Sequence, residues 1–318
     1  MEFRLLGPLE VLEGGRVVPV GGSKQRALLA VLLLHANEVV SRDRLIDELW
    51  GERLPGTAAH SLDHQVSRLR KVLEQSELLV TRPGGYLLQV DPEQIDVRRF
   101  EHLLEQGRRA NADGMPQQAS MALREALGLW RGAALADFAY ESFARVEIER
   151  LEELRLTALE ERIDADLALG QHHALGAELE SLIAKHPVRE RLRAQLMLAL
   201  YRSGRQAEAL RVYSETRKKL IEDLGIEPGQ VLQRLEQAIL RQDHSLDSPA
   251  AEAGTKTRRR RRTLLSATGL VVAAAAAAAG LLAARASYLA GFAGSATVLA
   301  APLYGIPILK ASSPYIFH

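Results

Sequence analysis

The segment from His60 to Tyr86 constrains the fold of this chain more than any other part of the sequence. Its first half predicts an amphipathic helix over residues 60–73, because apolar residues recur at helical spacing around Val66. The apolar face then holds Ala59, Leu62, Val66, Leu69 and Leu73. The opposite face holds His60, His64, Ser67, Arg68 and Lys71. A helix with one buried face and a face of Arg, Lys, Ser and His is of the kind that a DNA major groove admits.

A β-hairpin is predicted directly after this helix, over residues 78–90 (LLVTRPGGYLLQV). Pro83, Gly84 and Gly85 supply the turn, since Pro fixes one φ angle and Gly adopts the positive φ values that tight turns require. Arg82 precedes the turn and lies at the tip of the hairpin. From such a tip an arginine side chain can reach into a minor groove.

The sequence before the amphipathic helix predicts a small N-terminal sheet and two helices. Residues 1–20 are apolar runs broken by Gly-Pro and Gly-Gly, which is typical of short antiparallel strands. We expect a first helix over residues 24–36, with Ser23 as its N-cap and its LLAVLLL run buried. Ser41 is the expected N-cap of a second helix, which ends at Gly51.

These elements together resemble the winged helix-turn-helix of OmpR/PhoB-type response regulators. In that family a D-x-x-x-x-R-L-R pattern lies on the recognition helix, and a Gly-rich hairpin ending in Gly-Tyr is the wing. The matching residues here are Asp63, Arg68, Leu69, Arg70, Arg82, Gly85 and Tyr86. The family places this domain after a phosphoacceptor domain, whereas here it comes first. The resemblance implies a domain that binds DNA.

The pattern from Asp96 to about Gln242 is helical throughout, and Gly114, Gly170 and Gly204 each precede a new amphipathic segment. Gly170 and Gly204 are 34 residues apart, which is the tetratricopeptide period. The spacing alone predicts an array of helical hairpins, which stacks into a superhelix with a concave surface.

Residues from about 95 to 244 are similar to the bacterial transcriptional activator domain of the Streptomyces antibiotic regulatory protein (SARP) family. The segments that carry the resemblance include DVRRFEHLLEQGRRA, REALGLWRGAALADF and LQRLEQAIL. The resemblance implies a tetratricopeptide-like domain in a transcriptional activator. It also implies that copies bind side by side on direct DNA repeats, about one helical turn apart, and help to recruit RNA polymerase.

Six residues of the helix and hairpin are candidate DNA contacts. They are His64, Ser67, Arg68, Arg70, Lys71 and Arg82. Arg68 lies opposite the apolar face and is the expected base-reading residue, while Lys71 is expected to meet phosphate. Arg70 lies nearer the buried flank, where an internal or a phosphate partner fits as well as a base. The competing interpretation is an ordinary solvated helix face, and the adjoining hairpin favours DNA.

Composition and motifs exclude several other functions. Cys is absent, so the chain has no disulfide framework and no thiolate metal site. His60 and His64 have a zinc spacing, but the H-E-x-x-H pattern and a third ligand are missing, so no metal is expected. Phosphate-loop, G-x-S-x-G and EF-hand motifs are also absent, which predicts neither enzyme activity nor a cofactor. The net charge of +1 implies that any DNA affinity comes from a local patch.

The C-terminal part of the sequence predicts a membrane anchor. A linker over residues 245–262 ends in five arginines, Arg258 to Arg262, and residues 263–284 are 22 residues without a charge. As a helix these would span about 33 Å, enough to cross a bilayer. The arginine run favours an N-terminus inside the cell. The alternatives are a soluble Ala-rich helix and, in the tail of residues 285–318, a second hydrophobic pass.

The predicted protein is mainly α-helical, with an α+β winged helix over residues 1–92, a helical-repeat domain over 93–244 and one transmembrane helix. We expect a transcriptional regulator tethered to the cytoplasmic membrane. Its expected partners are double-stranded DNA, RNA polymerase, the membrane and further copies of itself on DNA. Two alternatives stay open: a soluble regulator with a hydrophobic appendage, and a membrane-anchored scaffold whose winged helix binds protein.

Overall fold

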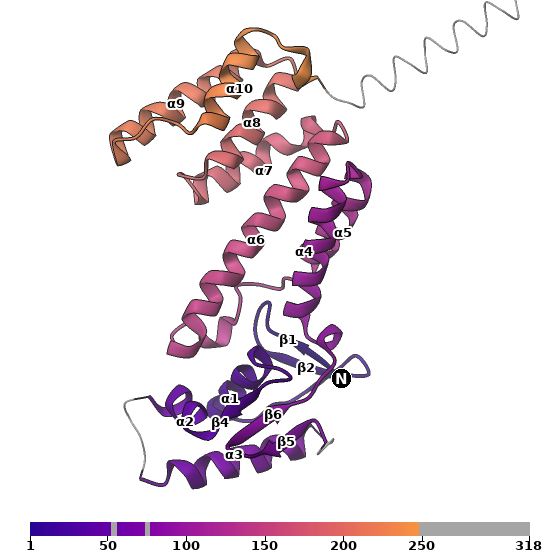
Figure 1. The fold of residues 1–318 in the computed structure, drawn as a ribbon, viewed down its shortest axis with the longest axis vertical. Coiled ribbons are helices and arrows are strands. Elements are labelled where there is room, and N and C mark those ends of the chain that lie inside the picture. The colour runs from indigo at the N-terminus through magenta and orange to yellow at the C-terminus, as the bar shows by residue number, and fades with distance from the viewer. Residues whose placement is uncertain (52–55, 74–76, 248–318) are drawn as a thin grey trace, which may run out of the picture. The chain divides into compact units, whose positions relative to one another are not determined.

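The computed structural model describes residues 1–51, 56–73 and 77–247 and begins with a small antiparallel sheet (Figure 1). Its strands are β1 (Glu2–Arg4), β2 (Glu10–Glu13) and β3 (Arg16–Val18), in that order. Gly14 and Gly15 join β2 to β3 with φ values of +55° and +80°. A two-residue hairpin turn of this type needs positive φ at both positions. The predicted N-terminal sheet is confirmed.

Three helices follow, and their starts test the predicted caps. They are α1 (Ser23–Leu34), α2 (Arg42–Trp50) and α3 (Ala58–Val72). Ser41 caps α2 as predicted, because its hydroxyl accepts a hydrogen bond of 3.2 Å from the Arg44 amide. The prediction for Ser23 is wrong by one residue: Gly22 is the N-cap of α1, and Ser23 is already helical. The apolar run of α1 is buried, as predicted.

A second sheet carries the predicted hairpin and one strand that the sequence analysis did not predict. Strands β5 (Leu79–Arg82) and β6 (Gly85–Leu88) form the hairpin, and β4 (Val39–Ser41) pairs with β6 in the order β4–β6–β5. Gly84 in the turn has a φ of +81°, which Gly adopts without steric cost. A Cβ on Gly85 would collide with the Val40 carbonyl oxygen, so close pairing of β4 and β6 requires Gly there.

The rest of the described chain is helical, as predicted. The elements are η1 (Pro92–Gln94), α4 (Asp96–Ala112), α5 (Pro116–Gly128), η2 (Ala136–Phe138), α6 (Ser142–Ala168), α7 (His172–Lys185), α8 (Glu190–Arg202), α9 (Gln206–Leu224), α10 (Gln230–Leu240) and η3 (His244–Leu246), where η marks a short 3-10 turn. Gly170 follows α6 and Gly204 follows α8, with φ values of +77° and +76°. Each helix from α6 to α10 packs on the next (Figure 1), so the predicted array of helical hairpins is confirmed.

Two hydrophobic cores stabilise this part of the chain, and helix α6 contributes to both. The first core extends from the N-terminal sheet to α6, where it takes Leu151, Ala158 and Ala165. The second lies among α6 to α10 and takes Leu156, Ile163 and Leu167 from α6. At about 100° per residue these two sets lie on opposite sides of the helix. Helix α6 therefore has two apolar faces, each covered by different elements.

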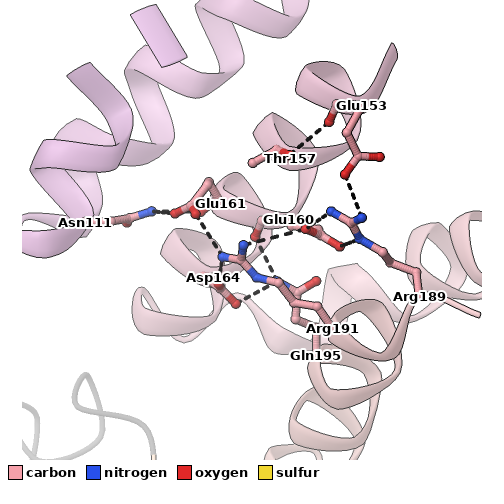
Figure 2. Close-up of polar contacts among 9 residues, drawn as sticks. All are labelled: Asn111, Glu153, Thr157, Glu160, Glu161, Asp164, Arg189, Arg191 and Gln195. Atoms are coloured by element: carbon pink, nitrogen blue, oxygen red, sulfur yellow. Dashed lines mark hydrogen bonds and ion pairs between the residues drawn. The ribbon is translucent and has the colours of Figure 1, made fainter. Parts of the chain in front are cut away.

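A cluster of carboxylates between α6 and α8 is neutralised by arginines (Figure 2). The Glu160 side chain is 1% exposed, and Arg189 donates to its two oxygens over 2.8 and 3.1 Å. Arg191 pairs with Asp164 at 2.6 Å and with Glu161 at 3.0 Å. Buried charges are costly unless paired and hydrogen-bonded in this way, so the cluster has a structural role. Among the described residues, no group of His, Cys or acidic side chains is arranged to hold a metal ion.

The junction between the winged-helix part and the helical part is a network of direct contacts. Asp96, the first residue of α4, accepts hydrogen bonds from the amides of Leu5 and Leu6 over 2.7 and 2.9 Å. Burial raises the pKa of this carboxyl, and the two amides offset part of that effect. Asp137 of η2 accepts from the Leu9 amide at 2.7 Å. The predicted boundary at residue 92 therefore separates two sequence patterns but does not separate two cores.

The structure contains no helix, within the residues it describes, that is both long and apolar enough to cross a membrane. The predicted anchor over residues 263–284, the arginine run Arg258–Arg262 and the tail of residues 285–318 lie outside the described residues. The anchor therefore stays a prediction from the sequence.

Candidate nucleic-acid interface

Helix α3 buries one face and exposes the other. The residues that pack into the first core are Leu62, Val66, Leu69 and Leu73, the last just after the helix. This face follows the prediction except at its start, where Ala58 is buried and Ala59 is exposed. The helix also begins before the predicted residue 60, at Ala58. The apolar side anchors α3 and fixes which side chains point outward.

Four polar side chains form a continuous stripe on the exposed face of α3. They are His64, Ser67, Arg68 and Lys71, at positions i, i+3, i+4 and i+7. Side chains at this spacing lie side by side along one face of a helix. The structure therefore brings four of the six candidate residues together on one exposed surface. Their contact with DNA stays a prediction.

Arg70 has a different environment from this stripe. Its Nε donates to the Leu79 carbonyl oxygen at 2.9 Å, and its Nη2 donates to the Thr81 hydroxyl at 2.8 Å. Both acceptors belong to β5. Of the partners that the sequence left open for Arg70, the structure thus provides the internal one. Arg70 ties the C-terminal end of α3 to the hairpin.

Arg82 is exposed at the end of β5, where it is paired with Gly85 in the hairpin register. Pro83 and Gly84, which form the turn, are exposed as well. The hairpin thus presents a cationic tip beside a turn that has little side-chain bulk. This geometry matches the predicted wing, and it places Arg82 on the strand that Arg70 holds.

A second polar contact, which the sequence analysis missed, joins α3 to β6. Arg42, the first residue of α2, donates through Nη1 to the Asp63 carboxylate at 2.7 Å and to the Tyr86 hydroxyl at 2.6 Å. The Tyr86 hydroxyl donates to the same Asp63 oxygen at 2.6 Å. The hydrogen bonds from Arg42 and then Tyr86 lower the pKa of the Asp63 carboxyl, while burial raises the pKa of Tyr86. We call Arg42, Asp63 and Tyr86 the α3–β6 triad.

The sequence held only a partial signal for this triad. Asp63 and Tyr86 matched the winged-helix pattern without a role of their own, and Arg42 matched nothing. Arg42 and Tyr86 are 44 residues apart, so helical or strand periodicity cannot bring them together. Only the pairing of β4 with β6 places Arg42, which directly follows β4, beside Tyr86.

These elements define a winged helix-turn-helix followed by a helical-repeat domain. Residues 95–240 match the family model described as bacterial transcriptional activator domain, and residues 19–88 match transcriptional regulatory protein, C terminal. The regulatory protein DnrI of Streptomyces peucetius is 41% identical over 262 residues, which cover 79% of this chain and 96% of DnrI. The regulatory protein AfsR of Streptomyces griseus is 43% identical, and this chain spans only 26% of its length.

A solved structure shows the same arrangement. The transcriptional regulator EmbR of Mycobacterium tuberculosis, in complex with a low-affinity phosphopeptide, is similar to this chain with a TM-score of 0.74 and 38% identity. The match covers 83% of this chain and 70% of EmbR. The chain therefore belongs to the SARP-type family of transcriptional regulators. It is a regulator and not an enzyme, as the absence of catalytic motifs predicted.

Proposed function

We propose that this protein activates transcription by binding specific DNA sites through α3 and the β5–β6 wing. The observation that carries the proposal is the stripe of His64, Ser67, Arg68 and Lys71 on a helix whose other face is fully packed. Arg and Ser can read base edges, and Lys and His can contact phosphates along the groove walls. Arg82 at the wing tip would then enter the neighbouring minor groove, whose negative potential attracts cations.

Replacing Arg68 by Ala should strongly weaken specific DNA binding and leave the fold intact. Arg68 is exposed, so the substitution opens no cavity, and a lost bidentate base contact costs about 1–3 kcal/mol. The measurement is the dissociation constant for a site selected with the wild-type protein, alongside a thermal melt. Arg145→Ala, on the exposed surface of α6, is the matched control. Wild-type affinity in the Arg68 variant would show that Arg68 does not read bases.

We propose that the DNA sites are direct repeats and that copies of the protein bind them side by side. The bound copies would then recruit RNA polymerase. Support comes from membership of the family, whose activator domain matches residues 95–240 of this chain. The repeats would be spaced by about one helical turn, so that successive copies face the same side of the duplex. Cooperative binding would then depend on the spacing between repeats as well as on their sequence.

We also propose that the C-terminal segment anchors the regulator to the cytoplasmic membrane. The proposal rests on the sequence alone: five arginines directly before 22 residues without a charge. A basic run on the cytoplasmic side fixes orientation and attracts anionic headgroups. The winged helix would stay in the cytoplasm, where DNA is accessible. The soluble regulator and the anchored scaffold remain as the other outcomes of the tests.

Fractionation tests the anchor. We expect the full chain to pellet with membranes and to resist alkaline extraction, whereas a fragment of residues 1–250 should stay in the supernatant and still bind DNA. Ala276→Arg, in the middle of the uncharged segment, is the matched control. Arg at a helix centre costs about 3 kcal/mol of insertion free energy, so this variant of the full chain should move toward the supernatant. Recovery of the unaltered full chain in the supernatant would leave the soluble regulator instead.

A further inference from the structure

Helix α3 is held against both strands of the wing by polar contacts. On the β6 side lies the α3–β6 triad, in which Asp63 near the middle of α3 meets Arg42 and Tyr86. On the β5 side, Arg70 reaches the Leu79 carbonyl and the Thr81 hydroxyl. The two contacts are about two helical turns apart along α3, so together they oppose both tilting and rotation of the helix against the hairpin.

The geometry of the triad leaves one member out of reach of DNA. Tyr86 is only 4% exposed, and its hydroxyl already donates to Asp63 and accepts from Arg42. Any effect of Tyr86 on DNA binding must therefore act through the position of α3. Arg42 also connects this contact to α2, because it is the first residue of that helix.

Arg70 contacts the residue next to the wing tip. Thr81, which accepts from Arg70 Nη2, directly precedes Arg82 in β5. Arg70 is also two residues from Arg68 on α3, which belongs to the exposed stripe. The Arg70 contact thus fixes the distance between the expected major-groove residue and the expected minor-groove residue.

We propose that Asp63, Arg70 and Tyr86 are positioning residues that hold α3 and the wing as one rigid unit, so that Arg68 and Arg82 engage adjacent grooves together. The inference rests on the proposed function and assigns Arg70 a role other than DNA contact. Two contacts held at a fixed spacing act as a bivalent ligand, in which the second contact forms without a new loss of freedom. A wing that moves relative to α3 would lose this advantage.

Stability and DNA binding can be separated, because Asp63 and Arg42 are both partly exposed. Their side chains are 49% and 35% exposed, and ion pairs of this kind add little to folding. Tyr86→Phe removes only the hydroxyl and leaves the ion pair in place, and water can hydrate the partly exposed carboxylate and guanidinium, so the melting temperature should change little. A purely structural role would change the melting temperature and leave the affinity of the folded protein for DNA as it was.

The test uses the full chain with Tyr86→Phe, Arg70→Gln and Thr81→Val, each compared with the wild type and with Arg68→Ala on a selected DNA site. We expect dissociation constants to rise about tenfold for Tyr86→Phe and Arg70→Gln, and about threefold for Thr81→Val, which removes a single hydrogen bond. The dependence of affinity on salt should change to the same extent in Tyr86→Phe and Arg70→Gln, because both act only through the position of the wing. A phosphate contact made by Arg70 itself would lower the slope of Arg70→Gln alone, by about 0.9 per phosphate.

A second measurement tests the coupling itself. Arg82→Ala should weaken binding less in the Tyr86→Phe background than in the wild type, because the wing contact is already impaired there. Wild-type affinity in both Tyr86→Phe and Arg70→Gln, or a salt slope lower for Arg70→Gln than for Tyr86→Phe, would overturn the positioning role while leaving the proposed function in place. If Tyr86→Phe does not fold, Thr81→Val decides the Arg70 half. A wild-type protein that binds no DNA site would overturn the proposed function, and this inference with it.

Discussion

Leu69→Asp should abolish folding of the winged-helix part, not merely its contact with a partner. Leu69 is fully buried in the first core together with Leu62 and Val66. Removing the side chain alone costs about 2–5 kcal/mol, and an unpaired carboxylate in its place costs several more. A domain of this kind has only about 5–15 kcal/mol of stability. Circular dichroism of a fragment of residues 1–250 should therefore lose helical signal and the unfolding transition of the first core, while the second core among α6 to α10 can keep its own.

The neighbouring residue gives the matched control for this prediction. Arg68→Asp introduces the same side chain one position earlier, on the exposed stripe. It should keep the wild-type melting curve but lose DNA binding, since a carboxylate would face phosphates. Comparing the variants Leu69→Asp and Arg68→Asp thus separates damage to the core from damage to the surface. A wild-type melting temperature for Leu69→Asp would show that the assignment of the two faces is wrong.

Periodicity predicted the parts of the fold that depend on neighbours in sequence. The faces of α3, the hairpin around Pro83 and Gly84, and the helical hairpins after Gly170 and Gly204 all follow from local spacing. Strand β4 was missed, because its three residues carry no alternating pattern of their own. It forms only because β6 offers it a partner.

The candidate site also has one part that local spacing predicts and one part that depends on contacts distant in sequence. Exposure of His64, Ser67, Arg68 and Lys71 could be predicted, since it depends on one helix. The partner of Arg70 could not be chosen, because that choice depends on where β5 lies relative to α3. Local spacing also cannot show that an arginine at the start of α2 meets the middle of α3.

A fragment of residues 1–92 should fail to fold cooperatively, although the winged-helix pattern ends there. In the structure the segment after β1 depends on the helical domain for its backbone hydrogen bonds. Arg131 and Leu135 donate their amides to the carbonyl oxygens of Leu6 and Leu5, both at 2.8 Å. Asp96 accepts from the amides of the same two residues. Without these partners, four backbone groups exchange their protein hydrogen bonds for water, at a net cost of about 0.5–1.5 kcal/mol each.

The apolar contacts also predict that a fragment of residues 1–92 does not fold cooperatively. The first core continues from Phe3 through Ile95 and Phe100 to Leu151, so a cut at residue 92 would expose its inner surface. The fragment of residues 1–250 keeps the whole core and is the matched control for thermal and urea unfolding. A single sharp transition for residues 1–92, near that of the longer fragment, would show that the junction contributes little and that the winged helix can move independently. Loss of that transition would mean that the winged helix needs the helical domain in order to fold, so that a change in the helical repeats could act directly on the position of α3.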